Sequence, residues 1–442
     1  MTTSLSGFPE LLPSQRFVEL AVLDKLRTVF ELHGFAPVET RAAEPLDALL
    51  RKGEIDKEVY VLRRLHASDD DGDAGLGLHF DLTVPFARYV LENAGRLEFP
   101  FRRYQIQKVW RGERPQEGRY REFTQADIDV VGRDDLPMHH DVEVARVMAE
   151  ALAGLDFLPP LRLQVNNRKL IEGFARGIGA SDIAGVMRTI DRLDKVPSDV
   201  VAKLLVDDAG LSDEQAAQCL RLAEIRAGDS SFVSRVWALG VAHPLLDEGL
   251  DELAAVIDGC ASISGITVEA DLRIARGLDY YTGTVFETRM SGYERLGSIC
   301  SGGRYDSLAS DGRATYPGVG ISLGVTRMLI PLFQRHVLDG SRPVPSAVLV
   351  ALPQEADRAA CDALAQQLRA RGIAAEVAAT AQKYGKQIRY AERRGIPFVW
   401  FPGEPDEVKD IRSGEQLPAD PATWLPPTDD LRPQVISTKA EQ

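Results

Sequence analysis

A pair of strand-like segments that flanks an arginine-rich loop, within residues 101–132, constrains the fold of this chain more than any other feature. In the second segment polar and apolar residues alternate, and Gln125, Asp127 and Asp129 occupy every other position. A period of two is that of a β-strand, so these three side chains share one face. The loop between the segments, residues 112–118, contains proline and glycine, which favour a turn. The pattern predicts a β-hairpin with one polar face.

The polar face of such a hairpin often does no more than point at water. The local charge argues for a site instead, because seven Arg or Lys and three Glu lie between Arg102 and Glu122 in a chain whose formal net charge is -14. Cations concentrated on a rigid sheet, next to paired carboxylates, suit a site that holds phosphates and a cationic group together. The acidic balance of the whole chain argues against a protein that coats nucleic acids in general, but it allows a specific RNA partner bound by local basic patches.

The composition is that of a soluble globular protein with two or three domains, because the chain has 442 residues, of which 44% are hydrophobic and 27% charged. No apolar run approaches the roughly 18 residues that a membrane-spanning helix needs. The first fifteen residues lack the basic and then apolar pattern of a secretion signal. We therefore expect a cytoplasmic protein that does not associate with membranes.

No certain metal site is predicted. The four cysteines, at positions 219, 260, 300 and 361, are scattered without CxxC spacing, which argues against both a disulfide framework and a zinc site. The acidic run at residues 69–73 lacks the spaced ligands and the terminal glutamate of a calcium loop. A solvated turn is the interpretation of that run.

Periodicity predicts the elements around the hairpin. An amphipathic helix is expected over residues 14–33, with Ser14 as its N-cap. Residues 140–155 are predicted as a helix, and residues 164–173 as a strand that runs into a helix. Strand character is predicted for residues 34–45, 59–65, 77–83, 79–90 and 271–287.

The C-terminal third has its own pattern. Residues 331–346 contain Gly340, Pro343 and Pro345 and are predicted as a linker. Strands and helices alternate beyond them, which predicts a compact α/β domain with a mostly parallel sheet and a short, trimmed final hairpin. The tail from Pro418, rich in proline and mixed charges, is predicted to be poorly ordered.

Four stretches resemble motifs of one enzyme class. WRGERPQEGRYREFTQ, residues 110–125, resembles motif 2 of the class II aminoacyl-tRNA synthetases in the form found in the histidyl-tRNA synthetase family. RGLDYY at residues 276–281 and SGGRYD at residues 301–306 resemble the two histidyl motifs, and GVGISLGVTRMLI at residues 318–330 resembles motif 3. The resemblance spans about residues 8–416 and keeps the order of the motifs.

The resemblance implies an α+β fold, in which a class II catalytic domain with an antiparallel sheet carries a helical insertion and precedes an α/β anticodon-binding domain. The composition of the middle third is helical and rich in charges, as such an insertion requires. We expect the catalytic core over residues 1–167 and 260–333, the insertion over 168–259, a linker over 334–345, the anticodon-binding domain over 346–417 and a tail over 418–442.

The implied activity is the condensation of L-histidine with ATP to histidyl-adenylate and pyrophosphate, followed by transfer of histidine to the 3′ end of tRNA(His). Attack of a carboxylate on the α-phosphate creates an anionic transition state, so positioning and cationic stabilisation should supply most of the rate. The resemblance assigns the α-phosphate to Arg111 and Arg276, the catalytic pair, and the γ-phosphate to Arg327. Glu113 and Phe123 complete the ATP site, with Phe123 on the adenine, and Mg²⁺ accompanies the nucleotide.

The histidine site is implied in the same way. Asp81, Thr83 and Gln125 would bind the ammonium group, and an Asp and a Thr two apart on a strand share the face that this requires. Asp129 and Tyr281 would bind the two imidazole nitrogens, with Arg276 and Tyr280 beside them. A pocket that pairs both nitrogens rejects analogues that leave a buried polar group unpaired.

The resemblance also implies a homodimer and a tRNA contact. The basic stretch at residues 382–395 would lie near the RNA backbone, although a basic helix face is as often only solvated. Two positions depart from the family pattern, because Arg41 stands where motif 1 has proline and His79 where arginine is common.

Two alternatives remain open. The synthetase-like regulatory subunit of ATP phosphoribosyltransferase is non-catalytic and typically lacks the anticodon-binding domain. The presence of Gln125, Arg276 and Arg327, together with a basic C-terminal domain, favours the enzyme. A prolyl or threonyl enzyme of the same subclass leaves RGLDYY and SGGRYD unexplained.

Overall fold

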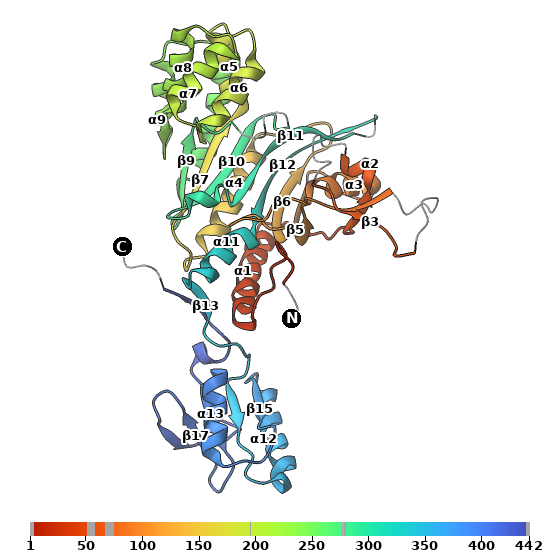
Figure 1. Cartoon of the computed structure of the whole chain (residues 1–442), viewed down its shortest axis with the longest axis vertical. Coiled ribbons are helices and arrows are strands. Elements are labelled where there is room, and N and C mark those ends of the chain that lie inside the picture. The colour runs from red at the N-terminus through yellow and green to blue at the C-terminus, as the bar shows by residue number, and fades with distance from the viewer. Residues whose placement is uncertain are drawn as a thin grey trace. The chain divides into compact units, whose positions relative to one another are not determined.

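The computed structural model describes residues 4–50, 58–66, 75–194, 196–275, 277, 280–310 and 312–438. The chain forms two compact units, shown in Figure 1. The first unit comprises Met1–Pro9 and Leu23–Pro331, and the second comprises Glu10–Val22 and Leu332–Gln442. The acidic run at residues 69–73 lies outside the described residues.

A nine-stranded sheet organises the described part of the first unit, in the order β1-β5-β6-β12-β11-β10-β7-β9-β8. Neighbouring strands are antiparallel except for β1 with β5 and β7 with β9. The strands are β1 (Ala36–Pro37), β5 (Phe101–Trp110), β6 (Glu122–Val131), β7 (Leu161–Asn167), β8 (Arg226–Ala227), β9 (Thr267–Asp271), β10 (Thr284–Met290), β11 (Cys300–Ser310) and β12 (Thr315–Gly324).

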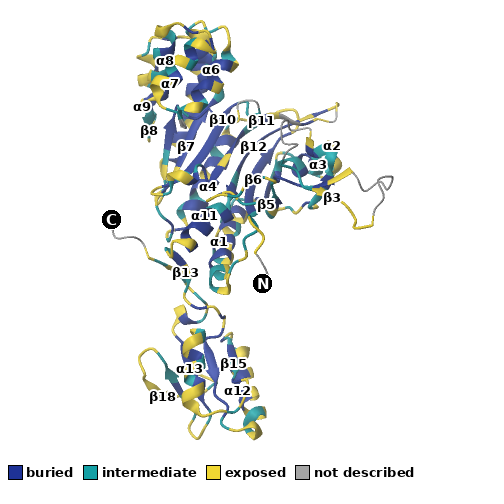
Figure 2. Ribbon diagram, viewed as in Figure 1, coloured by how far each residue is buried: buried dark blue, intermediate teal, exposed yellow. Residues whose placement is uncertain are grey.

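The predicted hairpin is confirmed as β5 and β6, which pair from Phe101 with Val131 to Trp110 with Glu122. Ala126, Ile128 and Val130 are fully buried on one face of β6. The polar positions between them are buried as well, so the polar face points into the protein and not at water. Figure 2 shows this burial along the strands of the sheet.

Helices accompany the sheet. The predicted helices are confirmed as α1 (Pro13–Leu32) and α4 (His139–Ala153), although Ser14 lies inside α1 and does not cap it, and α11 (Val325–Gln334) follows β12. The predicted helical region between β7 and β9 contains α5 (Arg168–Gly177), α6 (Ile183–Ile190), α7 (Ser198–Asp207), α8 (Asp213–Ala223), α9 (Ser231–Trp237) and α10 (Pro244–Cys260). These helices belong to the same compact unit as the sheet.

The strand predicted at residues 79–90 is wrong. Only β4 (Leu76–Leu78) precedes a turn, after which α3 (Thr83–Asn93) begins. Asp81 Oδ1 accepts hydrogen bonds from the backbone N–H groups of Thr83 and Val84, at 3.1 and 3.0 Å, and so satisfies donors that the first turn of a helix leaves unpaired. This local cap overrides the strand-like composition.

Other predicted elements are shorter than expected. In the three-stranded sheet of order β2-β4-β3, β2 spans Ala43–Pro45 and β3 spans Val61–Leu62, with α2 at Leu46–Leu50. The predicted strand over residues 271–287 is also wrong in its middle, because β9 ends at Asp271 and β10 starts at Thr284. The described residues between those two strands form turns and irregular backbone.

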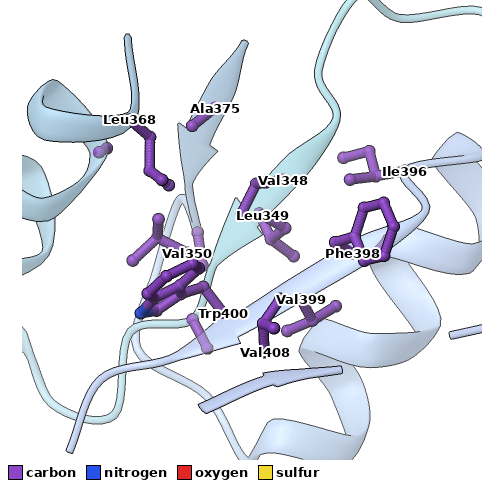
Figure 3. Packing of buried hydrophobic residues seen from close by; sticks show 14 of the residues in the cluster. Val348, Leu349, Val350, Leu368, Ala375, Ile396, Phe398, Val399, Trp400 and Val408 are labelled. Carbon is purple, nitrogen blue, oxygen red and sulfur yellow. The ribbon is translucent and has the colours of Figure 1, made fainter. Parts of the chain in front are cut away.

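The second unit contains the predicted α/β domain, with strands in the order β15-β14-β16-β17-β18. As predicted, β14 pairs in parallel with both of its neighbours, while β17 and β18 add a short antiparallel hairpin of three residue pairs. Figure 3 shows the core around Trp400, with Val350 and Leu368 beside it. The elements are β14 (Val348–Val350), α12 (Arg358–Ala370), β15 (Ala375–Val377), α13 (Tyr384–Arg394), β16 (Phe398–Phe401), β17 (Glu407–Asp410) and β18 (Gln416–Pro418).

The linker and the tail are more ordered than predicted. Pro331 lies inside α11, and β13 (Leu338–Gly340) pairs with β19 (Val435–Ser437). The tail is held by Trp424, whose ring packs edge-on against Phe398 and Trp400 at centroid distances of 5.3 and 5.5 Å. The packing of this aromatic side chain against the core outweighs the disordering effect of the prolines around it.

No helix in the described part of the chain is both long enough and apolar enough to cross a bilayer.

Candidate active site

A cavity of about 190 Å³ lies against β6, β12 and the loop between β5 and β6. Most of the predicted site residues line it, and they come from turns, strands and helix starts that are far apart in the sequence. They are Asp81, Thr83, Arg111, Glu113, Phe123, Gln125, Tyr281 and Arg327. The lining also includes Arg119, Tyr120, Ser298, Ser301 and Ser322.

A second, smaller cavity of about 40 Å³ adjoins the first, because Thr83, Tyr281, Ser301 and Ser322 line both. The remaining predicted residues, Asp129 and Tyr280, lie here with Asp127 and Tyr305. The structure therefore brings all of the described site residues to two adjoining cavities. Arg276, predicted for both the α-phosphate and the histidine, lies outside the described residues.

One end of the larger cavity is cationic. Arg111 donates from Nε to the carbonyl oxygen of Phe80 at 3.0 Å, and its guanidinium group lies 5.1 Å from the centroid of the Phe123 ring. Arg327 donates from Nε to Gly118 O at 2.7 Å and from Nη1 to Ser298 O at 2.8 Å. Carbonyl oxygens orient a guanidinium group without cancelling its charge, so this end suits phosphate groups.

The same end carries one carboxylate. Glu113 lies between two arginines, with Oε1 3.7 Å from Arg111 Nη1 and Oε2 3.5 Å from Arg119 Nη1. Its side chain keeps about a fifth of its surface exposed. Within the described ranges, no cluster of three or more His, Cys, Asp or Glu side chains is placed to hold a metal ion.

The smaller cavity is built around the carboxylate of Asp129. Asp129 Oδ2 forms an ion pair with Arg103 Nη2 at 2.6 Å, and Oδ1 accepts a hydrogen bond from the Tyr305 hydroxyl at 2.8 Å. Burial and the nearby Asp129 raise the pKa of Tyr305, which keeps the phenol protonated as a donor. Arg103 is fully buried and its guanidinium group lies 4.2 Å from the centroid of the Phe86 ring.

Glycines of β11 and β12 make room for these side chains. A Cβ atom at Gly303 would lie 2.6 Å from the Tyr281 ring, and one at Gly318 would lie 2.4 Å from the Tyr305 ring. Gly303, in the SGGRYD stretch, therefore allows the Tyr281 ring to approach the backbone closely, which a side chain would prevent.

Asp81 and Thr83 reach the cavity by a different route from the one predicted. They do not share a strand face, since Thr83 begins α3 and Asp81 lies in the turn before it. The cap that Asp81 forms on the helix fixes the orientation of its carboxyl group, and both side chains still line the larger cavity.

Sequence reasoning missed four residues that shape the site. Arg103 and Tyr305 hold Asp129, and Ser322 connects Gln125 with Asp127. The alternation along β6 already placed Asp127 on the polar face, and Ser322 is the one hydroxyl between the apolar residues Ile321 and Leu323. These two patterns single out Asp127 and Ser322, but neither pattern shows which residue each side chain bonds.

The two departures from the family pattern lie apart from these cavities. His79 is fully buried, its Nε2 lies 2.7 Å from Lys108 O, and its ring is 5.5 Å from that of Trp110. Arg41 is half exposed and forms an ion pair with Glu44 at 3.4 Å. His79 and Arg41 therefore contact other parts of the protein, and neither residue lines the two cavities.

Comparisons with known proteins show which family this chain resembles. The family model described as "Histidyl-tRNA synthetase" matches residues 7–328, and the one described as "Anticodon binding domain" matches residues 346–417. Proteins named "Histidine--tRNA ligase" from Cutibacterium acnes and Micrococcus luteus are each 60% identical to this chain, and each alignment covers 98% of both proteins.

Solved structures give the same assignment. The crystal structure of histidyl-tRNA synthetase from Nostoc sp. superposes with a TM-score of 0.84 at 34% identity, covering 94% of this chain and 96% of that one. The structure of an ATP phosphoribosyltransferase regulatory subunit/histidyl-tRNA synthetase from Bacillus halodurans superposes at 0.71 with 21% identity, covering 88% of this chain and 96% of that one, which shows the shared fold alone. The fold is that of a class II synthetase with a C-terminal anticodon-binding domain, and the chain belongs to the histidyl-tRNA synthetase family.

Proposed function

We propose that this chain is a histidine–tRNA ligase, which activates L-histidine with ATP to histidyl-adenylate and transfers it to the 3′ end of tRNA(His). One observation carries the proposal: two adjoining cavities share lining residues, and arginines line the larger one while buried carboxylates line the smaller one. Such a pair of cavities accommodates a phosphate chain and a cationic amino acid side by side, as the adenylation reaction requires.

The cationic end would hold ATP. The carboxylate of histidine attacks the α-phosphorus and pyrophosphate leaves, so negative charge accumulates on the phosphate oxygens. Arg111 is proposed to stabilise that charge and Arg327 to hold the γ-phosphate, because backbone carbonyls already fix both guanidinium groups. Arg276 is proposed as the second α-phosphate residue by resemblance. Phe123, on the wall beside Arg111, would stack on the adenine.

Mg²⁺ is proposed to accompany the nucleotide. This ion is usually held by one or two carboxylates together with substrate phosphates and water. Glu113 fits that requirement, since its partly exposed carboxylate lies at the cationic end of the cavity. When bound, the ion would neutralise phosphate charge in addition to the arginines.

The carboxylate end would hold histidine. Asp81, Thr83 and Gln125 are proposed to bind its ammonium group, since all three residues line the larger cavity. Asp129 and Tyr281 are proposed to bind the imidazole nitrogens, with Tyr280 beside them. Each carboxylate oxygen has two lone pairs, so Asp129 can accept a further hydrogen bond while it keeps Arg103 and Tyr305.

The C-terminal domain would hold the anticodon. A cavity of about 550 Å³ in the second unit lies along α13 and is lined by Lys386, Arg389, Tyr390 and Arg393. Cationic and aromatic side chains together suit a single-stranded RNA segment. We further propose a cytoplasmic homodimer with the domain division expected from the sequence, in which the insertion at residues 168–259 lies near the acceptor end of the tRNA.

The regulatory-subunit alternative is not favoured. The relatives that match this chain at 60% identity over 98% of their length are named as ligases, whereas the Bacillus halodurans structure matches at 21% identity. The anticodon-binding domain, which that subunit typically lacks, is present.

A charging assay tests the whole proposal. The purified chain is incubated with ATP, Mg²⁺, labelled histidine and a tRNA(His) transcript, and acid-precipitable label is measured. Formation of histidyl-tRNA(His), with none on an unrelated tRNA transcript, supports the proposal. A folded protein that charges neither transcript contradicts it.

A further inference from the structure

We propose that Asp127 and Ser322 are positioning residues, which fix the orientation of the Gln125 amide so that its oxygen faces the ammonium group of the amino acid. This inference rests on the proposed function, in which Gln125 binds that group. It concerns a buried carboxylate and a hydroxyl to which the activity itself assigns no role.

The three side chains form a chain of hydrogen bonds across two strands. Gln125 Nε2 donates to Ser322 Oγ at 2.5 Å, and the Ser322 hydroxyl donates to Asp127 Oδ1 at 2.5 Å. Ser322 lies directly opposite Asp127 in the pairing of β12 with β6, and Gln125 is two residues away on the same face. Gly324 stands opposite Gln125, so no side chain separates Gln125 from Ser322.

The direction of these hydrogen bonds follows from the chemistry of Asp127, the last acceptor in the series. In the ionised form of Asp127 the carboxylate only accepts hydrogen bonds, so the Ser322 hydroxyl donates its single proton to Asp127. The Ser322 oxygen then has lone pairs left and takes a proton from Gln125, which must offer its NH₂ group. The amide oxygen is consequently the atom that remains for another donor.

The structure leaves the amide oxygen of Gln125 available to another donor. Gln125 Oε1 is buried and, among the groups that the structure describes, has no hydrogen-bond partner. Gln125 lines the larger cavity together with Asp81 and Thr83. Burying an acceptor without a donor is unfavourable unless a ligand supplies the donor, and an ammonium group carries three.

Stability alone does not account for Asp127. Burial raises the pKa of its carboxyl group to about 7, with Arg103 opposing this effect and Asp129 and Asp81 adding to it, so the ionised form is unfavourable in this environment. The nearby guanidinium group of Arg103 is closest to Asp129 and not to Asp127. A carboxylate kept at such a place is typical of a functional group.

Two ligands separate this role from a general effect on the pocket. Histidinol carries the imidazole and the ammonium group, whereas 3-(imidazol-4-yl)propionate carries the imidazole and no ammonium group. Dissociation constants are measured by calorimetry at pH 8, where Asp127 is mostly ionised. In Ser322→Ala and Asp127→Asn the amide can rotate, so histidinol should bind about tenfold or more weakly, while the propionate changes less than about twofold.

Controls and a double variant sharpen the test. Ser310→Ala, on the neighbouring strand β11, removes a hydroxyl that donates to the backbone oxygen of Ala314, and should change neither constant. If Asp127 acts through Ser322, the double variant should lose no more histidinol affinity than the larger single loss. Should Asp127→Asn fail to fold, Ser322→Ala alone decides the matter.

The outcomes distinguish the two proposals. Equal weakening of both ligands in Ser322→Ala, or no weakening of either, would overturn the positioning role. If the unaltered protein binds neither ligand, the proposed function itself has failed. Selective loss of histidinol affinity supports both.

Discussion

The carboxylate of Asp129 occupies the space that a side chain at Gly320 would need. The two residues are paired in the sheet, and a Cβ atom at position 320 would lie 2.0 Å from Asp129 Oδ1. The backbone of β12 therefore forms one wall of the proposed imidazole site. The carboxylate can occupy its position because residue 320 is a glycine and has no side chain.

Gly320→Ala should displace that carboxylate. We expect the KM for histidine to rise about tenfold or more, with a loss of about 1–3 kcal/mol in the free energy of unfolding from overpacking. Exchange kinetics and thermal unfolding measure the two effects. Gly95→Ala is the matched control, because a Cβ atom at Gly95 meets nothing within 4 Å. An unchanged KM in Gly320→Ala would separate Asp129 from histidine binding.

Asp129→Ala should raise the KM for histidine far more than the KM for ATP. Loss of an imidazole partner should cost about a hundredfold or more in kcat/KM for histidine, while the KM for ATP changes less than about twofold. Because Arg103 is fully buried and would lose its counterion, unfolding should become easier by about 3–5 kcal/mol. Equal changes in both KM values would contradict the assignment.

Asp127→Asn should increase stability, and more so at high pH. Burial raises the pKa of this carboxyl from 3.8 to about 7, so the folded state binds the proton more tightly than the unfolded state does. Folded wild-type protein therefore loses stability as the pH rises from 3.8 to about 7, on the order of a few kcal/mol at most, and asparagine removes that loss. Denaturant unfolding at pH 5 and pH 8.5 measures the difference, and a difference that does not vary with pH would contradict the buried titration.

Arg111→Ala should remove transition-state stabilisation and leave histidine binding intact. We expect the kcat of pyrophosphate exchange to fall about 10²–10³-fold, the usual effect of losing one preorganised donor to a developing anion. The dissociation constant of histidinol should stay within about twofold, since Arg111 lines the larger cavity and Asp129 lines the smaller one. A large change in histidinol affinity would place Arg111 in the amino-acid site.

Arg389→Ala and Arg393→Ala should affect tRNA and not adenylation. Both arginines line the cavity along α13, and an arginine that binds a phosphate should, when replaced, lower the salt dependence of tRNA binding by about one unit of slope. Exchange without tRNA should be unchanged. Arg432→Ala, an arginine outside that lining, serves as the control, and an equal effect there would mean only a general loss of charge.

The parts of the structure that the sequence predicts are those governed by short-range patterns. The alternation in β6 fixes its two faces, and the alternation of elements beyond residue 346 fixes the α/β domain. The resemblance supplies site residues that do gather in one space, from Asp81 to Arg327. Each of these follows from residues that are close in the chain or match a known motif.

The rest depends on contacts between distant residues. The cap of Asp81 turns a strand-like stretch into α3, and the packing of Trp424 orders a proline-rich tail. Arg103, Tyr305 and Ser322 reach their partners only through the pairing of β5, β6, β11 and β12, and no local pattern contains that pairing.

The most direct test of the proposed activity is ATP–pyrophosphate exchange, in the absence of tRNA, with each of the twenty amino acids. We predict exchange with histidine alone, because the cavity pairs a cationic end for ATP with a buried carboxylate end for an imidazole and an ammonium group. A folded protein that exchanges with no amino acid, or equally well with several, would contradict this prediction.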